Sequence, residues 1–199
     1  MAEPVSYFLQ VKAILDMGKA VYDRVQTVKS FKKSSKQLGE RLNMALKIVQ
    51  EIRDLEKERK LLFETSGIFK SIGLAFERLH RFILKADEFT KKLAGKAPWK
   101  TFITANDIKG KFESLNKALS CFQADMDNTL QVNAVRESAE ISEMLRTMVK
   151  PHLTKLKDSE HNCISAITDD FKAVKDELED LRQEIQQGMC MILICLSQK

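Results

Sequence analysis

Apolar residues recur along the first 132 residues at spacings of three and four, which is the period of an α-helix. Residues 8–28, 38–52 and 68–86 each contain such a stripe. The clearest stripe consists of Ile108, Phe112, Leu115, Leu119, Phe122, Met126 and Leu130. Each stripe makes one face of a helix apolar, and neighbouring helices must cover that face. Residues 1–132 are therefore predicted to form an antiparallel four-helix bundle in an all-α protein.

The pattern also predicts where helices begin and end. Apolar positions before and after residues 30–35 fall on different faces of one helical wheel, so the first two helices should separate there. Ser34 and Gln37 have the spacing of a capping box, which places Ser34 at the start of the second helix. Pro151 should stop a short helix marked by residues 141–148, and Gly188 should stop the last helix.

Beyond the bundle, a stricter alternation of three and four persists for three heptads, as in a coiled-coil seam. The seam consists of Ile164, Ile167, Phe171, Val174, Leu178, Leu181 and Ile185. The flanking pair Glu177 and Arg182 lies five residues apart, which suits contact between parallel copies rather than along one helix. Packing of the seam against its own bundle stays equally open, because three heptads are few.

These patterns divide the chain into three parts. Residues 1–132 form the bundle, 133–188 form a brace of two helices, and 189–199 form a short apolar tail. The longest apolar run, Met189–Leu196, is far shorter than the ~20 residues that a membrane-spanning helix needs.

Composition supports the helical prediction, because the 199 residues include only seven Gly and three Pro. Cys121, Cys163, Cys190 and Cys195 lack CxxC spacing and are interpreted as reduced thiols of a cytosolic protein. The last two, in the apolar tail, could be palmitoylated or pack on the brace, and packing is favoured.

Positive charge is concentrated near the N-terminus. The chain carries +5 overall, with +9 in residues 1–100 and −4 in residues 101–199. Residues 24–42 hold one acid, Glu40, against six basic residues, namely Arg24, Lys29, Lys32, Lys33, Lys36 and Arg41. The four lysines fall within about 100° on a helical wheel. A solvated turn would explain them, but so would binding of nucleic acid, inositol phosphates or an anionic membrane.

Nucleic acid is disfavoured, because Phe31, Phe69, Phe76 and Phe112 lie in or near the core stripes rather than among the basic residues as stacking platforms. Anionic lipid is favoured, because basic residues on an amphipathic helix gain roughly 1 kcal/mol each near such a surface.

Motifs typical of enzymes are lacking. No GxxxxGK or GxGxxG loop occurs, and His80 and His152 have no catalytic spacing. His161 and Cys163 are too few for a metal site. The sequence therefore predicts a non-enzymatic protein without cofactor or metal.

Two stretches, KAVYDRVQTVKSFKKSSKQLGERL and FITANDIKGKFESLNKALSCF, together with the trailing helical brace, carry a resemblance. In their order and spacing they resemble the N-terminal executioner domain of mixed lineage kinase domain-like proteins. The resemblance runs from about Ile14 to Gln187, and the Arg, Lys-Lys and Leu-Gly-x-Arg spacing is its most distinctive part.

The resemblance implies a bundle and brace that oligomerise, bind phosphoinositides and permeabilise the plasma membrane in necroptosis. It implies recruitment from the cytoplasm, and it places the six basic residues above at positions that contact lipid head groups. Ser34 and Ser35 stand where relatives can be more basic or carry cysteine.

The pseudokinase domain of the family has no counterpart in these 199 residues. The chain is accordingly expected to be a short form or a piece of a longer protein, and a full-length relative is a candidate partner beside a second copy. The alternative function is a non-lytic helical adaptor or regulatory short form that acts through protein–protein interaction.

Overall fold

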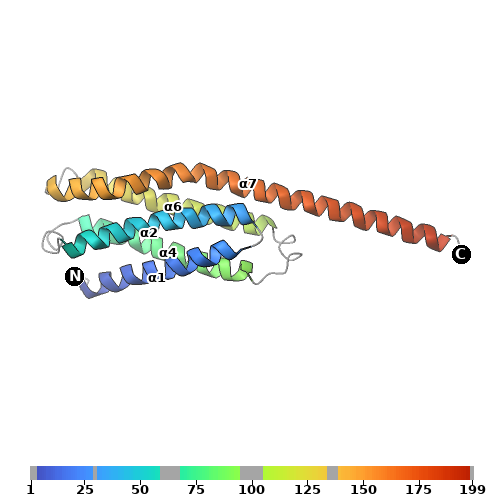
Figure 1. Ribbon diagram of the computed structural model, residues 1–199, viewed down its shortest axis with the longest axis horizontal. Helices are drawn as coiled ribbons and strands as arrows, with labels where there is room; N and C mark the ends of the chain where they lie inside the picture. The colour runs from blue at the N-terminus through green and yellow to red at the C-terminus, as the bar shows by residue number, and fades with distance from the viewer. Residues whose placement is uncertain (1–3, 29–30, 59–67, 95–104, 134–138, 198–199) are drawn as a thin grey trace.

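The computed structural model describes residues 4–28, 31–58, 68–94, 105–133 and 139–197, and the regular structure in these ranges is entirely α-helical (Figure 1). The helices are α1 (Pro4–Thr27), α2 (Lys32–Glu58), α4 (Ile68–Ala94), α6 (Ala105–Asn133) and α7 (Ala139–Ser197). The predicted all-α fold, a bundle followed by a brace, is confirmed.

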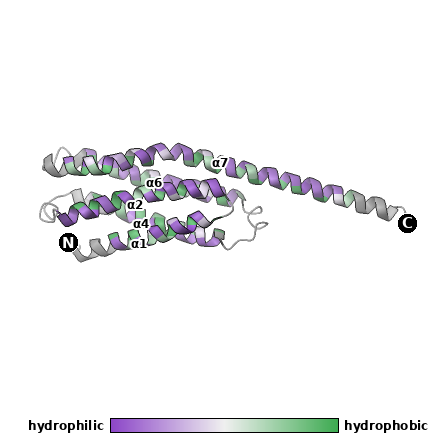
Figure 2. Cartoon of the chain, viewed as in Figure 1, coloured by the Kyte–Doolittle hydropathy of each residue, from purple (hydrophilic) through white to green (hydrophobic). Residues whose placement is uncertain are grey.

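The first four of these helices run alternately up and down beside one another (Figure 1). α1 packs on α2 and α4, and α4 packs on α6. The apolar stripes meet in one core, which includes Ile14, Phe76, Phe112 and Phe122. Figure 2 shows hydrophilic and hydrophobic residues alternating along the same helices. Burial of these stripes is the main term that stabilises the bundle.

α7 forms a second layer over the bundle. It packs on α2 and α6, and its C-terminal part projects well beyond them (Figure 1). Among the described residues, no helix combines the length and apolarity that crossing a bilayer requires.

The predicted separation of the first two helices is confirmed. α1 ends at Thr27 and α2 begins at Lys32, with Phe31 between them at a φ of 55°. Residues other than glycine rarely adopt this left-handed backbone conformation. Here the Phe31 side chain is only 3% exposed and its ring centroid lies 5.9 Å from that of Phe112. Burial of the ring therefore offsets the backbone cost of the turn.

Both predicted stops after the bundle are wrong, and the brace is one helix rather than two. α7 passes through Pro151 and Gly188 without ending. Pro151 is exposed, whereas Val149 and Leu153 on either side are buried against the bundle. Packing of these neighbours offsets the backbone hydrogen bond that proline cannot donate.

Candidate functional site

The exposed lysines at the start of α2 are the first part of the site. Lys32, Lys33 and Lys36 extend into solvent, and we call these three residues the α2 basic patch. Lys36 Nζ lies 4.0 Å from Glu40 Oε1, and no ion pair is described for Lys32. Lys29, the fourth lysine of the predicted cluster, lies outside the described residues.

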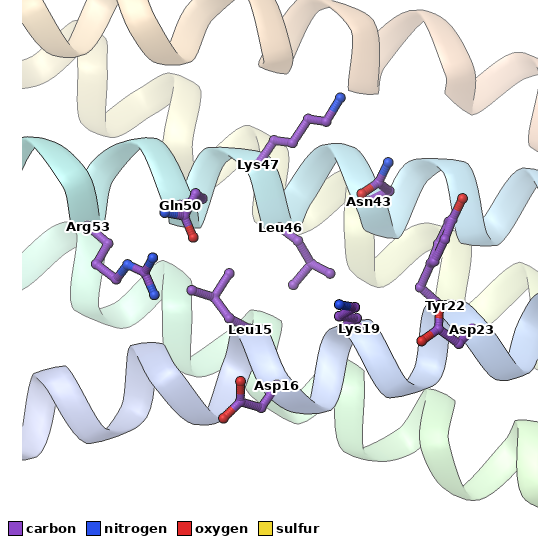
Figure 3. A pocket seen from close by; sticks show the side chains of 10 residues that line it. All are labelled: Leu15, Asp16, Lys19, Tyr22, Asp23, Asn43, Leu46, Lys47, Gln50 and Arg53. Atoms are coloured by element: carbon purple, nitrogen blue, oxygen red, sulfur yellow. The ribbon is translucent and has the colours of Figure 1, made fainter.

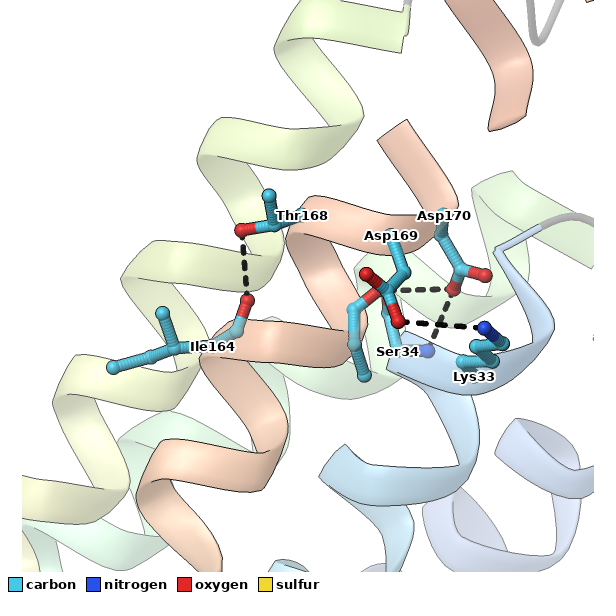
Figure 4. Close-up of polar contacts among 7 residues, drawn as sticks. Lys33, Ser34, Ile164, Thr168, Asp169 and Asp170 are labelled. Carbon is cyan, nitrogen blue, oxygen red and sulfur yellow. Dashed lines mark hydrogen bonds and ion pairs between the residues drawn. The ribbon is translucent and has the colours of Figure 1, made fainter. Parts of the chain in front are cut away.

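Two acidic residues of α7 lie against this patch (Figure 4). Lys33 Nζ is 3.3 Å from Asp169 Oδ2. Asp170 Oδ2 accepts hydrogen bonds from the backbone N–H and from the hydroxyl of Ser34, both at 2.7 Å. A carboxylate at a helix N-terminus pairs with free backbone N–H groups and with the helix dipole. Asp170 therefore caps α2 from another helix.

The sequence had assigned the cap to Ser34 itself, which is incorrect. Ser34 lies inside the first turn of α2, and its hydroxyl bonds to α7. The capping residue stands 136 positions away in the chain, so no local motif could have indicated it.

Arg24 has a partner on α4. It forms an ion pair with Asp87, and Lys91 Nζ lies 2.6 Å from the other oxygen of the same carboxylate. Hydrogen bonds from Lys91 and from Arg24 lower the pKa of Asp87 despite its partial burial. Arg24 thus joins α1 to α4 instead of standing free beside the lysines.

Arg41 is fully buried, which corrects the expectation that it extends the exposed cluster. Its Nη1 donates to the carbonyl oxygen of Asn116 at 3.2 Å and to the Asn116 side chain. Its Nη2 donates to Ser120 Oγ at 3.2 Å, and the Ser120 hydroxyl donates to Glu160 Oε1 at 2.5 Å. The guanidinium therefore ties α2 to α6 and, through Ser120, to α7.

Burial dominates the electrostatics around Arg41. Desolvation lowers the pKa of Arg41, and the nearby Cys163 and Glu160 oppose that shift. Burial also raises the pKa of the Cys163 thiol to about 11. Cys163 consequently stays protonated at neutral pH and behaves as a core residue rather than a nucleophile.

The predicted seam divides into two parts. Ile167 is 1% exposed, while Phe171 and Val174 pack against the bundle core, with Lys109 Nζ 4.7 Å from the centroid of the Phe171 ring. In the other part, Leu178, Leu181 and Ile185 are exposed. The interpretation that the seam packs on its own bundle therefore holds for the first part.

Ile164 departs from the predicted seam. Its side chain is half exposed, and the neighbouring Cys163 is buried against the bundle in its place. Cys163 and Ile167 lie four residues apart and so share one face of α7, whereas Ile164 lies about 100° around the helix from Cys163.

Comparison with known families decides where this arrangement belongs. A model of the mixed lineage kinase domain-like N-terminal domain matches residues 11–150. The chain belongs to this family. No curated protein and no solved structure gives a match.

The mixed lineage kinase domain-like N-terminal domain is a non-catalytic helical effector domain of necroptosis-type cell death. The match begins within α1, covers α2, α4 and α6, and ends within α7. Glu160, Asp169 and Asp170, through which α7 contacts the bundle, lie outside the matched range.

The cysteines of this family member are free where they are described. Cys121 and Cys190 are exposed and Cys163 is buried, whereas the side chain of Cys195 lies outside the described residues. The described part of the chain contains no group of three or more His, Cys, Asp or Glu side chains with metal-binding geometry.

Proposed function

We propose that the chain is a membrane-permeabilising effector of necroptosis-type cell death that binds phosphoinositide-containing membranes and oligomerises through α7. The family match over residues 11–150 is the observation that carries this proposal. The exposed α2 basic patch and the exposed end of the seam support its two steps.

Lipid binding is assigned to Lys32, Lys33 and Lys36, with Lys29 added from the sequence. Arg24 and Arg41 act indirectly, because one pairs with Asp87 and the other is buried. Each exposed lysine gains roughly 1 kcal/mol near an anionic leaflet. The Lys33–Asp169 pair is exposed on both sides, so a phosphate can compete with the carboxylate at little cost.

Oligomerisation is assigned to Leu178, Leu181 and Ile185, because these apolar side chains have no cover in the described structure. Parallel copies in register would bring Glu177 of one helix near Arg182 of the next. Several linked copies would multiply weak lipid contacts by avidity. Ile164 and the docked residues Ile167, Phe171 and Val174 would join this contact only if α7 left the bundle.

Dye release from liposomes tests the proposal. Vesicles that contain phosphoinositide should leak, and neutral vesicles should not. The triple variant Lys32→Gln, Lys33→Gln, Lys36→Gln should release less dye and lose salt sensitivity. Its matched control replaces three exposed lysines elsewhere, Lys85, Lys117 and Lys155, by Gln and should leak like the parent chain. Equal leakage from both vesicle types, or none, contradicts the proposal.

A second candidate function is a regulatory helical adaptor. Asp169 and Asp170 lie against the α2 basic patch, and the exposed end of α7 offers an apolar stripe to a partner helix. Analytical ultracentrifugation distinguishes the two functions. An adaptor sediments as a monomer or as a defined complex with its partner and does not float with phosphoinositide liposomes.

A further inference from the structure

A groove between α1 and α2 plays no part in the contacts described so far (Figure 3). It encloses a volume of about 460 Å³. Leu15 of α1 and Leu46 of α2 form its apolar part. The Leu46 side chain can lie there because the facing residue is Gly18, where a Cβ atom would overlap it. The close approach of two helices at a glycine thus creates an apolar floor at the surface.

Charged groups of both signs border this floor. Lys19, Lys47 and Arg53 line the groove, as do Asp16 and Asp23. No ion pair is described for the two lysines or the two aspartates, although their side chains are described. Arg53 Nε is buried without a hydrogen bond and lies 3.5 Å from Asp54 Oδ1. A ligand with both charges could therefore find partners on this rim.

The two ends of the groove differ. Figure 3 shows Arg53, Leu15 and Asp16 near one end, whereas Tyr22 and Asn43 lie near the other. From Asn43 to Arg53 the groove follows α2 for roughly 15 Å, given the rise of an α-helix. Its volume suits one drug-sized ligand rather than two acyl chains. The length and volume of the groove therefore fit a lipid with a single acyl chain, whose polar head group would lie at the Arg53 end.

We propose that this groove binds one molecule of a zwitterionic phospholipid with a single acyl chain. The acyl chain lies on Leu15 and Leu46, the phosphate accepts hydrogen bonds from Arg53, and the ammonium group lies near Asp16. Arginine binds phosphate oxygens through a fork of donors, which gives this end its selectivity.

The groove is distinct from the α2 basic patch. α7 packs on α2 and α6 and leaves the α1 side of the groove open. Lipid can enter it while α7 stays docked. The proposal consequently does not rest on membrane permeabilisation, and a monomeric ligand tests it without a bilayer.

Calorimetric titration of the whole chain with dodecylphosphocholine, below its micelle-forming concentration, tests the inference. We expect saturable one-to-one binding. Glycerophosphocholine, which lacks the chain, and dodecyl maltoside, which lacks the charges, should each bind about tenfold more weakly or worse. Equal affinity for dodecyl maltoside, or binding without saturation, overturns the proposal.

Variants then locate the site. Arg53→Gln and Asp16→Asn should each weaken dodecylphosphocholine binding, by about tenfold for the arginine. Lys33→Gln, in the α2 basic patch, should bind like the parent chain. Both groove residues are at least partly exposed, so thermal unfolding should show folded proteins. Unchanged affinity in both groove variants places the ligand elsewhere and overturns the assignment.

Discussion

α7 has two parts that differ in their surroundings although their apolar patterns are alike. From Leu145 to Val174 its apolar side meets α2 and α6, whereas Leu178, Leu181 and Ile185 project beyond the bundle without cover. Charged residues appear on both parts, but in the described structure only those of the docked part contact other helices, as at Glu160, Asp169 and Asp170. On the projecting part Arg182 pairs with Glu179 of the same helix. The difference shows that an apolar stripe determines which face of a helix must be buried. It does not determine which other helix packs against that face.

The largest expected effect is on the stability of the protein when Arg41, the buried charge beneath the docked part of α7, is replaced. Arg41→Ala should lower the free energy of unfolding by about 3 kcal/mol, because it leaves a cavity and unpaired acceptors on Asn116 and Ser120. Urea denaturation measures this change. Arg41→Met fills the volume and should recover part of the loss. Arg182→Ala, on the projecting part, should change stability by less than about 0.5 kcal/mol.

The same substitution at Ile167, in the docked part of α7, and at Ile185, in the projecting part, compares the two parts directly. Ile167→Ala should cost roughly 2–3 kcal/mol, because Ile167 is buried against the bundle. Ile185, which is 64% exposed, should tolerate the same change with little loss of stability. Sedimentation of the Ile185→Ala variant should instead show weaker self-association. A similar stability loss in both variants would mean that the projecting part also packs on a bundle.

The cap that α7 supplies to α2 should have a smaller effect. Asp170→Ala removes the acceptor for Ser34 and should cost about 1 kcal/mol. Hydrogen exchange should then speed up in the first turn of α2. Asp169→Ala breaks only an exposed ion pair and serves as the control. Equal hydrogen-exchange rates in the first turn of α2 in the two variants would show that Asp170 does not cap this helix.

The smallest effect is expected on a side of the bundle that α7 does not cover. The pKa of Asp87 is lowered in the folded protein by Lys91 and Arg24, so the stability it contributes is complete above its unfolded pKa of about 3.9 and is lost as pH falls through its folded pKa. NMR titration should show a higher Asp87 pKa in the Lys91→Gln variant. The same variant should leave the exchange rates of α7 unchanged.

The basic residues of the candidate site could be picked out from the sequence, but their contacts with other helices could not. Lys32, Lys33 and Lys36 stand out because a local excess of charge is visible in the chain, and their exposure agrees with that interpretation. Arg41 carries the same charge in the same stretch and is nevertheless buried. Its position depends on Asn116 and Ser120, which lie on another helix.

Helix ends show a similar limit. Pro151 disfavours a helix locally, yet burial of Val149 and Leu153 outweighs that preference. The groove between α1 and α2 was not predicted, because its floor combines Leu15 with Leu46 across a glycine contact. A sequence pattern records which residues share a helix face, and it does not record which helix comes closest.

The sequence by itself determined that this protein is all-α, that four apolar stripes form a bundle, and that a basic cluster marks the turn between its first two helices. These features follow from periodicity and local charge, which neighbouring residues specify. The tertiary structure alone decided that Asp170 caps α2, that Arg41 is buried, and that the seam is covered only from Ile167 to Val174. Each of these depends on residues distant in the chain, which come together only when the helices pack.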